Sequence, residues 1–295
     1  MDTHLFQKIG ACMLLSFASL FSYAEKLPLQ VEMNLHNGAI NQLKVEKDKT
    51  EMNWLIKTDG TQYPWVREDL AWGLGYFTLT QGHESIKKMW NNPVEINSDG
   101  TDVVYREGDI RIQVKRIFQN GDLTEEYTFS NEGKEAVSLY DIGIYTPFND
   151  NYPGAEECIQ ARTNVQVWNG ESAAYLNALR MGSFAPHVGL VVTEGAIKSY
   201  EIWERGAEKG NSQYRGVFAL NPPDLYLKPG ASYTLAWKLF SHEGNDDFKQ
   251  KLLESGSLLV SCDKYVYQKG ETARIEIVSA RPLENYEARL NGVPV

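Results

Sequence analysis

The chain consists mainly of short segments in which apolar and polar residues alternate. This period of two is typical of antiparallel strands with one face buried and the other in water. The segments that show it are residues 29–35, 102–106, 110–117, 123–129, 136–145, 165–168, 188–193, 217–220 and 232–240. The pattern predicts an all-β fold.

Turn dipeptides separate these segments and favour tight hairpins, because Gly after Asn or Asp readily takes positive φ. They are Asn37-Gly38, Asp59-Gly60, Asp99-Gly100, Asn120-Gly121, Asn169-Gly170 and Pro229-Gly230. Residues 25–245 would then hold about fifteen antiparallel strands, which without covering helices must stack as sheets. We therefore predict one large antiparallel β-supersandwich over residues 25–245.

A short amphipathic helix is predicted at residues 246–254, stopped by Gly256, and residues 246–257 would form a helical connector. Further short strands are predicted beyond it, at residues 258–261, 264–267, 273–278 and 286–290. Their spacing matches the start of a small immunoglobulin-like β-sandwich, which needs about seven strands. Residues 258–295 are too few for that number, so we expect an incomplete sandwich and a sequence that continues in a longer protein. The alternative is an appendage packed on the large domain.

The first 24 residues resemble a signal peptide rather than part of the fold. Lys8 precedes an apolar stretch at 9–21 that is shorter than the roughly 20 residues of a membrane anchor. Cleavage is predicted after Ala24, which places the mature protein in the periplasm or outside the cell. A lipoprotein site at Cys12 is the weaker alternative. No later segment is apolar enough to predict a membrane span.

The formal net charge of −10 argues against nucleic acid and anionic lipid as partners. Cys158 and Cys262 are predicted to be two buried free thiols rather than a disulfide, because nothing else indicates a disulfide framework. Cys and His do not occur at metal-binding spacings, so neither a metal nor another cofactor is predicted.

Five segments carry a resemblance to a known family. Residues 175–182 read YLNALRMG, residues 185–195 read APHVGLVVTEG, and residues 225–244 read LYLKPGASYTLAWKLFSHEG. Residues 63–66 (YPWV) and 72–77 (WGLGYF) fit the same pattern. Together they resemble the N-terminal galactose-mutarotase-like β-supersandwich of large secreted bacterial glycosidase-like proteins.

In such proteins a small linker sandwich and an (α/α) toroid catalytic domain follow the supersandwich. The resemblance therefore implies a carbohydrate partner, a poly- or oligosaccharide, and a C-terminal catalytic domain. Those proteins carry a His-rich stretch where this chain has residues 158–170, which contain no histidine. Roles of the relatives' histidines are therefore not transferred to this chain.

A catalytic centre is not predicted. Sugar epimerisation needs a carboxylate and a histidine as base and acid, and His187 and His242 are the histidines considered for it. Each is expected to satisfy a backbone group instead. The adjacent pairs Glu125-Glu126 and Glu156-Glu157 are expected on extended or loop backbone, where neighbours point to opposite faces, and to form solvated acidic surface.

Sugar binding is the better-supported chemistry, because aromatic rings stack on pyranose faces while amide and charged groups bind the hydroxyls. Asn149 lies in the polar, aromatic loop 145–154, where Asp150 offers oxygen ligands without the spacing of a calcium loop. Arg180 is expected to face an acidic sugar or an internal carboxylate, two alternatives that the sequence leaves open. The candidate carbohydrate-binding residues are Trp168, Asn169, Arg180, His187, Trp203 and Asn149.

The favoured interpretation is a noncatalytic carbohydrate-binding or structural N-terminal module of a secreted polysaccharide-processing, glycosidase-like protein. One alternative is a free-standing mutarotase-like epimerase that uses a histidine and a glutamate. A purely structural spacer is the other.

Overall fold

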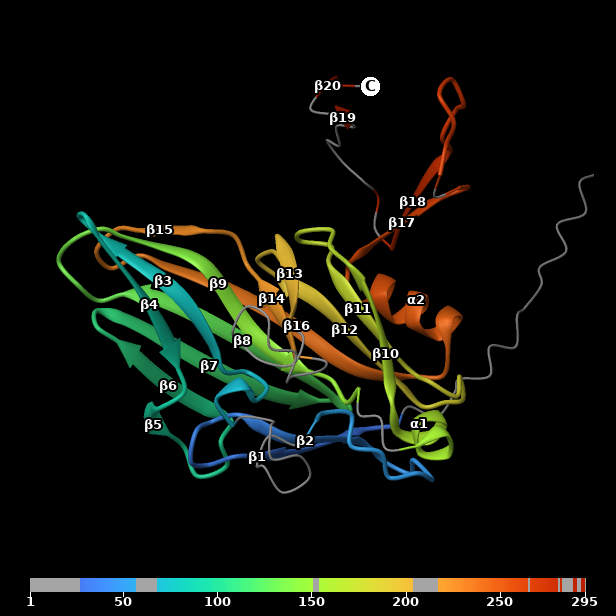
Figure 1. Cartoon of the computed structure of the whole chain (residues 1–295), viewed down its shortest axis with the longest axis horizontal. Helices are drawn as coiled ribbons and strands as arrows, with labels where there is room; N and C mark the ends of the chain where they lie inside the picture. The colour runs from blue at the N-terminus through green and yellow to red at the C-terminus, as the bar shows by residue number, and fades with distance from the viewer. Residues whose placement is uncertain are drawn as a thin grey trace, which may run out of the picture.

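The computed structural model describes residues 27–56, 68–150, 154–203, 217–264, 266–280, 282, 289–290 and 293–294. Two large sheets, antiparallel in every described pairing, form the body of the molecule (Figure 1). The predicted all-β fold class is therefore confirmed. The signal-peptide prediction lies outside the described residues.

The larger sheet has eight strands. In spatial order they are β10 (Thr163–Trp168), β11 (Tyr175–Arg180), β12 (His187–Glu194), β16 (Ser232–His242), β8 (Asp122–Asn131), β7 (Ile110–Gln119), β6 (Asp102–Glu107) and β5 (Pro93–Ile96). The smaller sheet contains β13 (Ser199–Trp203), β14 (Val217–Asn221), β9 (Val137–Pro147), β3 (Gly75–Gln81) and β4 (Glu84–Trp90), and β15 (Leu225–Leu227) pairs with β9.

One hydrophobic core joins the two sheets. It includes Phe77 and Leu139 from the smaller sheet and Val114, Phe129 and Trp237 from the larger sheet, all of them fully buried. Alternation along the strands produces this core, because every second side chain of a strand points to the same face. The hairpin of β1 (Leu29–Met33) and β2 (Ile40–Val45) runs along one side of the sandwich.

Several of the predicted turns have the positive φ angles expected of them. At the β7–β8 hairpin both Asn120 and Gly121 have positive φ, 52° and 82°, as a type I′ turn requires. Gly38, Gly100 and Gly230 also have positive φ. At Asn169-Gly170 the prediction fails in detail, since the positive φ of 54° belongs to Glu171.

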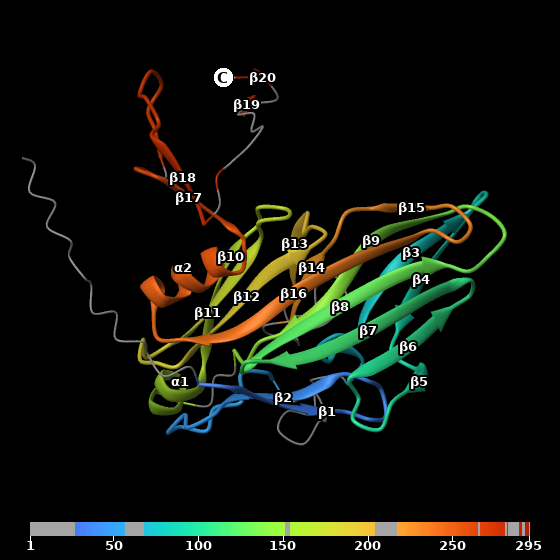
Figure 2. The same ribbon diagram turned by 180° about the vertical axis from the view of Figure 1, so that it is seen from behind.

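The predicted helix is confirmed as α2 (Asn245–Glu254), which packs on the outer face of the larger sheet (Figure 2). Phe248 and Leu252 of α2 form a second small core with Val191 of β12 and Phe240 of β16. None of the helices in the described part of the chain is long and apolar enough to cross a membrane.

Two further elements differ from the prediction. Residues 155–161 form a short helix, α1 (Ala155–Ala161), so Glu156 and Glu157 are helical rather than extended, although both are exposed as expected. A 3₁₀ turn, η1 (Glu68–Leu70), was likewise not predicted. Cys158 and Cys262 do not form a disulfide, as predicted, and Cys158 is buried; the prediction that Cys262 is buried is wrong, since it is exposed.

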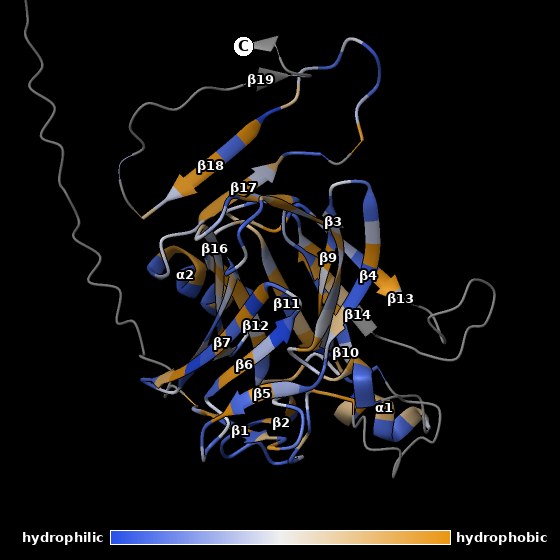
Figure 3. Cartoon of the chain, turned by 90° about the vertical axis from the view of Figure 1, so that its left-hand side faces the viewer, coloured by the Kyte–Doolittle hydropathy of each residue, from blue (hydrophilic) through white to orange (hydrophobic). Residues whose placement is uncertain are grey.

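Beyond α2 lie the ribbon of β17 (Leu258–Cys262) and β18 (Ile275–Ser279) and the short pair β19 (Arg289–Leu290) and β20 (Val293–Pro294). The ribbon projects from the sandwich, and β18 is mainly apolar with one charged residue, Glu276 (Figure 3). The strand predicted at 264–267 is not formed at the described residues of that range, Lys264, Val266 and Tyr267.

Candidate functional site

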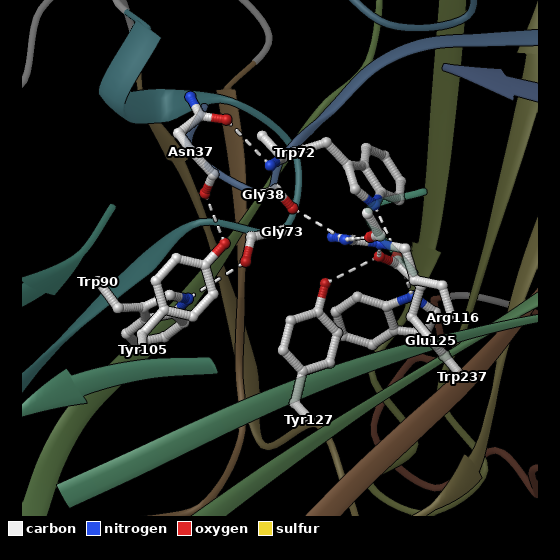
Figure 4. Close-up of polar contacts among 12 residues, drawn as sticks. Asn37, Gly38, Trp72, Gly73, Trp90, Tyr105, Arg116, Glu125, Tyr127 and Trp237 are labelled. Carbon is white, nitrogen blue, oxygen red and sulfur yellow. Dashed lines mark hydrogen bonds and ion pairs between the residues drawn. The ribbon is translucent and has the colours of Figure 1, made fainter. Parts of the chain in front are cut away.

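A buried carboxylate lies on the inward face of β8, next to turns that precede β2, β3 and β6 (Figure 4). Glu125 is 0% exposed, and its Oε2 accepts hydrogen bonds from the indole Nε1 of Trp72 at 2.6 Å and of Trp237 at 3.0 Å. Its Oε1 accepts from Arg116 Nε at 2.9 Å and from the Tyr127 hydroxyl at 3.1 Å. Four donors therefore converge on one carboxyl group.

Arg116 connects this carboxylate to the loops above it. Its Nη1 donates to the carbonyl oxygens of Gly38 at 2.8 Å and Gly100 at 3.2 Å. Gly73 packs tightly against the Arg116 guanidinium, because a Cβ at this position would lie only 2.7 Å from Arg116 Nη2. The polar cluster therefore fixes the β1–β2 turn, the β5–β6 turn and the segment before β3 against the larger sheet.

The electrostatics indicate an ion pair at this position. Burial alone would lower the pKa of Arg116, but Glu125, Tyr127 and Tyr105 together outweigh it, and the pKa is raised. Burial and then Glu125 raise the pKa of Tyr127 well above its ordinary value, so its hydroxyl stays protonated and donates. The prediction that Glu125 forms solvated surface is wrong, whereas Glu126, on the opposite face, is half-buried.

A second polar group lies under α2, where two histidines face each other across β12 and β16. His187 and His242 are register partners with ring centroids 5.2 Å apart, and both are buried. His187 Nδ1 accepts from the Arg180 backbone N–H at 3.1 Å. His242 Nδ1 lies 3.1 Å from the Gly244 carbonyl oxygen, so it carries the proton.

Their surroundings keep both rings neutral. Burial and the charge of Arg180 lower the pKa of His187. Burial and His187 lower the pKa of His242 to about 4. His242 Nε2 is buried without a hydrogen-bond partner among the described residues, so a proton there would find no acceptor. Each ring contacts a backbone group, as expected from the sequence, and neither lies at an open surface. Carbohydrate binding by His187, the other expectation for this residue, stays a prediction that its burial does not favour.

Trp168 is the predicted binding residue that the structure places at the surface. It ends β10, the edge strand of the larger sheet, and is 37% exposed. Its ring stacks on Tyr175 of β11 at 6.3 Å and 20°, and Asn169 beside it donates to the Lys198 carbonyl oxygen. The side chain of Trp203 lies outside the described residues.

Arg180 and Asn149 are held by other parts of the chain. Arg180 is buried, and its Nη2 donates to Asp48 at 2.6 Å while its guanidinium lies against the rings of Trp54 and Phe184. Of the two alternatives that the sequence left open, the structure places Arg180 on an internal carboxylate. Asn149 is half-buried and donates to the Asn53 carbonyl oxygen at 3.0 Å.

Sequence reasoning missed the Glu125 cluster, although a signal for it exists. Every second residue of a strand points to the same face. The face of β8 that carries Leu123, Tyr127 and Phe129 therefore also carries Glu125, and the three apolar or aromatic residues indicate that this face is buried. A buried glutamate requires a partner. On β7 the same alternation places Arg116 on the inward face, where it can be that partner.

Comparison with known proteins places the chain beside carbohydrate-active proteins. No family model matches it, and no curated protein matches it either. A solved polysaccharide lyase is 60% identical, with a TM-score of 0.88, and the match covers 92% of this chain and 41% of that chain.

Two more distant likenesses have TM-scores of 0.44 and 0.46. One is to a galactose mutarotase related enzyme from Lactobacillus acidophilus, at 12% identity over 76% of this chain and 98% of that chain. The other is to a GH36 alpha-galactosidase from Geobacillus stearothermophilus, at 11% identity over 78% and 42%.

The likeness to the lyase confirms the predicted relation to a module of large polysaccharide-processing proteins. The chain spans about two fifths of the length of that lyase, since the match covers 41% of it.

Proposed function

We propose that this chain is a noncatalytic carbohydrate-binding module of an exported polysaccharide-processing protein. The observation that carries the proposal is the 60% identity, over 92% of the chain, to one part of a polysaccharide lyase. The other 59% of that lyase lies outside the match, which leaves room for the chemistry in a partner domain. Export after cleavage at Ala24 belongs to the same proposal.

The burial of the acid–base candidates supports a noncatalytic role. A mutarotase-like mechanism needs an acid and a base that reach the sugar ring. Glu125, His187 and His242 are at most 3% exposed, and their polar atoms are engaged or enclosed within the fold. The free-standing epimerase is therefore the weaker alternative.

The surface around Trp168, which Tyr175 and Asn169 adjoin, supports the proposal of carbohydrate binding. Its indole is partly open to solvent at the edge of a rigid sheet, and Tyr175 holds it in place by stacking. A flat, immobilised ring can stack on a pyranose with little loss of side-chain entropy, and Asn169 adds polar groups beside it. A purely structural spacer would not need such a ring at the surface.

Replacement of Trp168 by alanine is expected to weaken glycan binding about tenfold, equivalent to about 1.4 kcal/mol. Stacking area is lost, but the buried core stays unchanged because Trp168 lies outside it. Affinity electrophoresis in gels that contain alginate, polygalacturonate or xylan would measure the change. Phe118→Ala is the matched control, since Phe118 is a 48% exposed aromatic residue on β7. Equal retardation of Trp168→Ala and wild type would show that Trp168 does not contribute to glycan binding.

A further inference from the structure

A pocket of about 280 Å³ lies where the turn after β2, the loop between β11 and β12 and the end of β16 meet. Its lining residues include Lys47, Asp48, Lys49, Phe184, Pro186 and Glu243. The pocket is separate from the surface around Trp168. Arg180, which contacts its wall, is the register partner of Thr163 at the start of β10, whereas Trp168 ends that strand about 17 Å further along.

One wall of the pocket is a phenyl ring that a buried ion pair supports. Phe184 is 40% exposed, and the guanidinium carbon of Arg180 lies 4.7 Å from the centroid of its ring. Arg180 is 1% exposed, and its Nη2 donates to Asp48 Oδ2 at 2.6 Å. The ring is therefore held from inside the protein, while part of it stays open to a ligand.

Two charged side chains at the pocket are not used by the fold. Lys49 and Glu243 are exposed, and neither side chain forms a hydrogen bond or ion pair within the described part of the chain. Their backbone is nevertheless held in place. Asp48, next to Lys49, accepts from the Thr50 backbone N–H at 3.1 Å, and the Glu243 backbone N–H donates to Asp247 at 2.8 Å. Both side chains can therefore bind a ligand from fixed positions.

This combination fits a sugar ring that carries no charge. A phenyl face packs on the apolar face of a pyranose, a carboxylate accepts hydrogen bonds from sugar hydroxyls, and an ammonium group donates to them. Lys47 and Lys49 disfavour a cation and Glu243 disfavours an anion, so the mixed charges favour a neutral ligand with many hydroxyls. The volume is just below the roughly 300–1,000 Å³ of pockets for drug-sized ligands, which suits one ring rather than several.

We propose that this pocket binds a single neutral pyranose ring, which packs on Phe184 and hydrogen-bonds through its hydroxyls to Lys49 and Glu243. The proposal rests on the proposed function and deepens it, because it adds a second sugar site and names the ligand class of that site. Since the pocket and the surface around Trp168 share no residue, separate substitutions distinguish the two proposals.

The test is a titration of the full chain with glucose, galactose and mannose, followed by saturation-transfer difference NMR. At least one of these sugars is expected to bind with a Kd in the millimolar range, as suits a small polar ligand. Lys49→Ala/Glu243→Ala is expected to weaken this binding at least about tenfold. The matched control is Lys134→Ala/Glu84→Ala, which removes the same two charges at exposed positions outside the pocket. Thermal unfolding of each variant checks that the fold is kept.

The ligand class is tested with the uronate and the 2-amino derivative of the sugar that binds, because each keeps the ring and adds one charge. Both are expected to bind more weakly than the neutral sugar, and tighter binding of either overturns the neutral class.

Two results overturn the pocket as a sugar site: wild-type affinity in Lys49→Ala/Glu243→Ala, or no binding of the three sugars at tens of millimolar. The proposed function then still stands if wild type is retarded in the polysaccharide gels and Trp168→Ala is not. If wild type is not retarded either, both proposals fail.

Discussion

Replacement of Glu125 by glutamine is expected to lower the free energy of unfolding by about 3–5 kcal/mol, the usual cost of breaking a buried ion pair from one side. The carboxylate is 0% exposed and receives four hydrogen bonds. Without its charge, Arg116 would remain an uncompensated cation in the core. A small domain is stable by only about 5–15 kcal/mol, so this loss is large.

Urea denaturation followed by tryptophan fluorescence measures this change. Glu126→Gln is the matched control, because Glu126 is the next residue on the same strand and points to the other face. Its effect is expected to stay within about 0.5 kcal/mol. The double variant Arg116→Met/Glu125→Leu is expected to recover part of the loss, since no buried charge is left unpaired. A Glu125→Gln protein as stable as the control would contradict the assignment of an ion pair.

Stability is also expected to fall steeply in acid, because of the histidine pair beneath α2. Burial and the proximity of His187 lower the pKa of His242 to about 4, against an ordinary value of 6.5. Between those two pH values the unfolded chain binds a proton that the folded chain does not. The stabilisation is therefore complete above about pH 6.5 and is lost as the pH falls toward 4, about 3 kcal/mol from His242 alone.

His242→Asn is expected to flatten this pH dependence while it lowers stability at neutral pH, because the substitution removes ring contacts with Phe240 and Phe248. The measurement is the urea midpoint at half-unit steps from pH 4 to 7. His83→Asn, at an exposed position of the β3–β4 turn, is the control and is expected to follow wild type. A His242→Asn protein with the full wild-type slope would show that other groups cause the acid sensitivity.

Alternation along the chain predicted the strands that have one wet face, such as β7 and β8. It did not predict β11, which is missing from the alternating segments although its neighbour β12 is among them. In β11, Asn177 and Arg180 are buried along with Leu176 and Ala178, so polar residues interrupt the apolar pattern. The helix α1 was missed because it is short and has no side-chain cap. These features depend on tertiary contacts that local patterns do not contain.

The candidate site residues likewise divide into those that the local sequence could predict and those that depend on tertiary contacts. Trp168, beside an Asn-Gly turn at a strand end, could be recognised as a surface residue from its sequence neighbourhood. The burial of Arg180 could not, because its partner Asp48 is 132 residues away in the sequence.

The central claim, a module that binds a glycan without converting it, is tested most directly by one incubation. Purified chain is mixed with alginate, polygalacturonate or xylan, and both the bound fraction and the length distribution of the recovered glycan are measured. The account predicts that at least one of these polysaccharides is retained and recovered at its original length. Shortened glycan, or no retention of any polysaccharide, would contradict it.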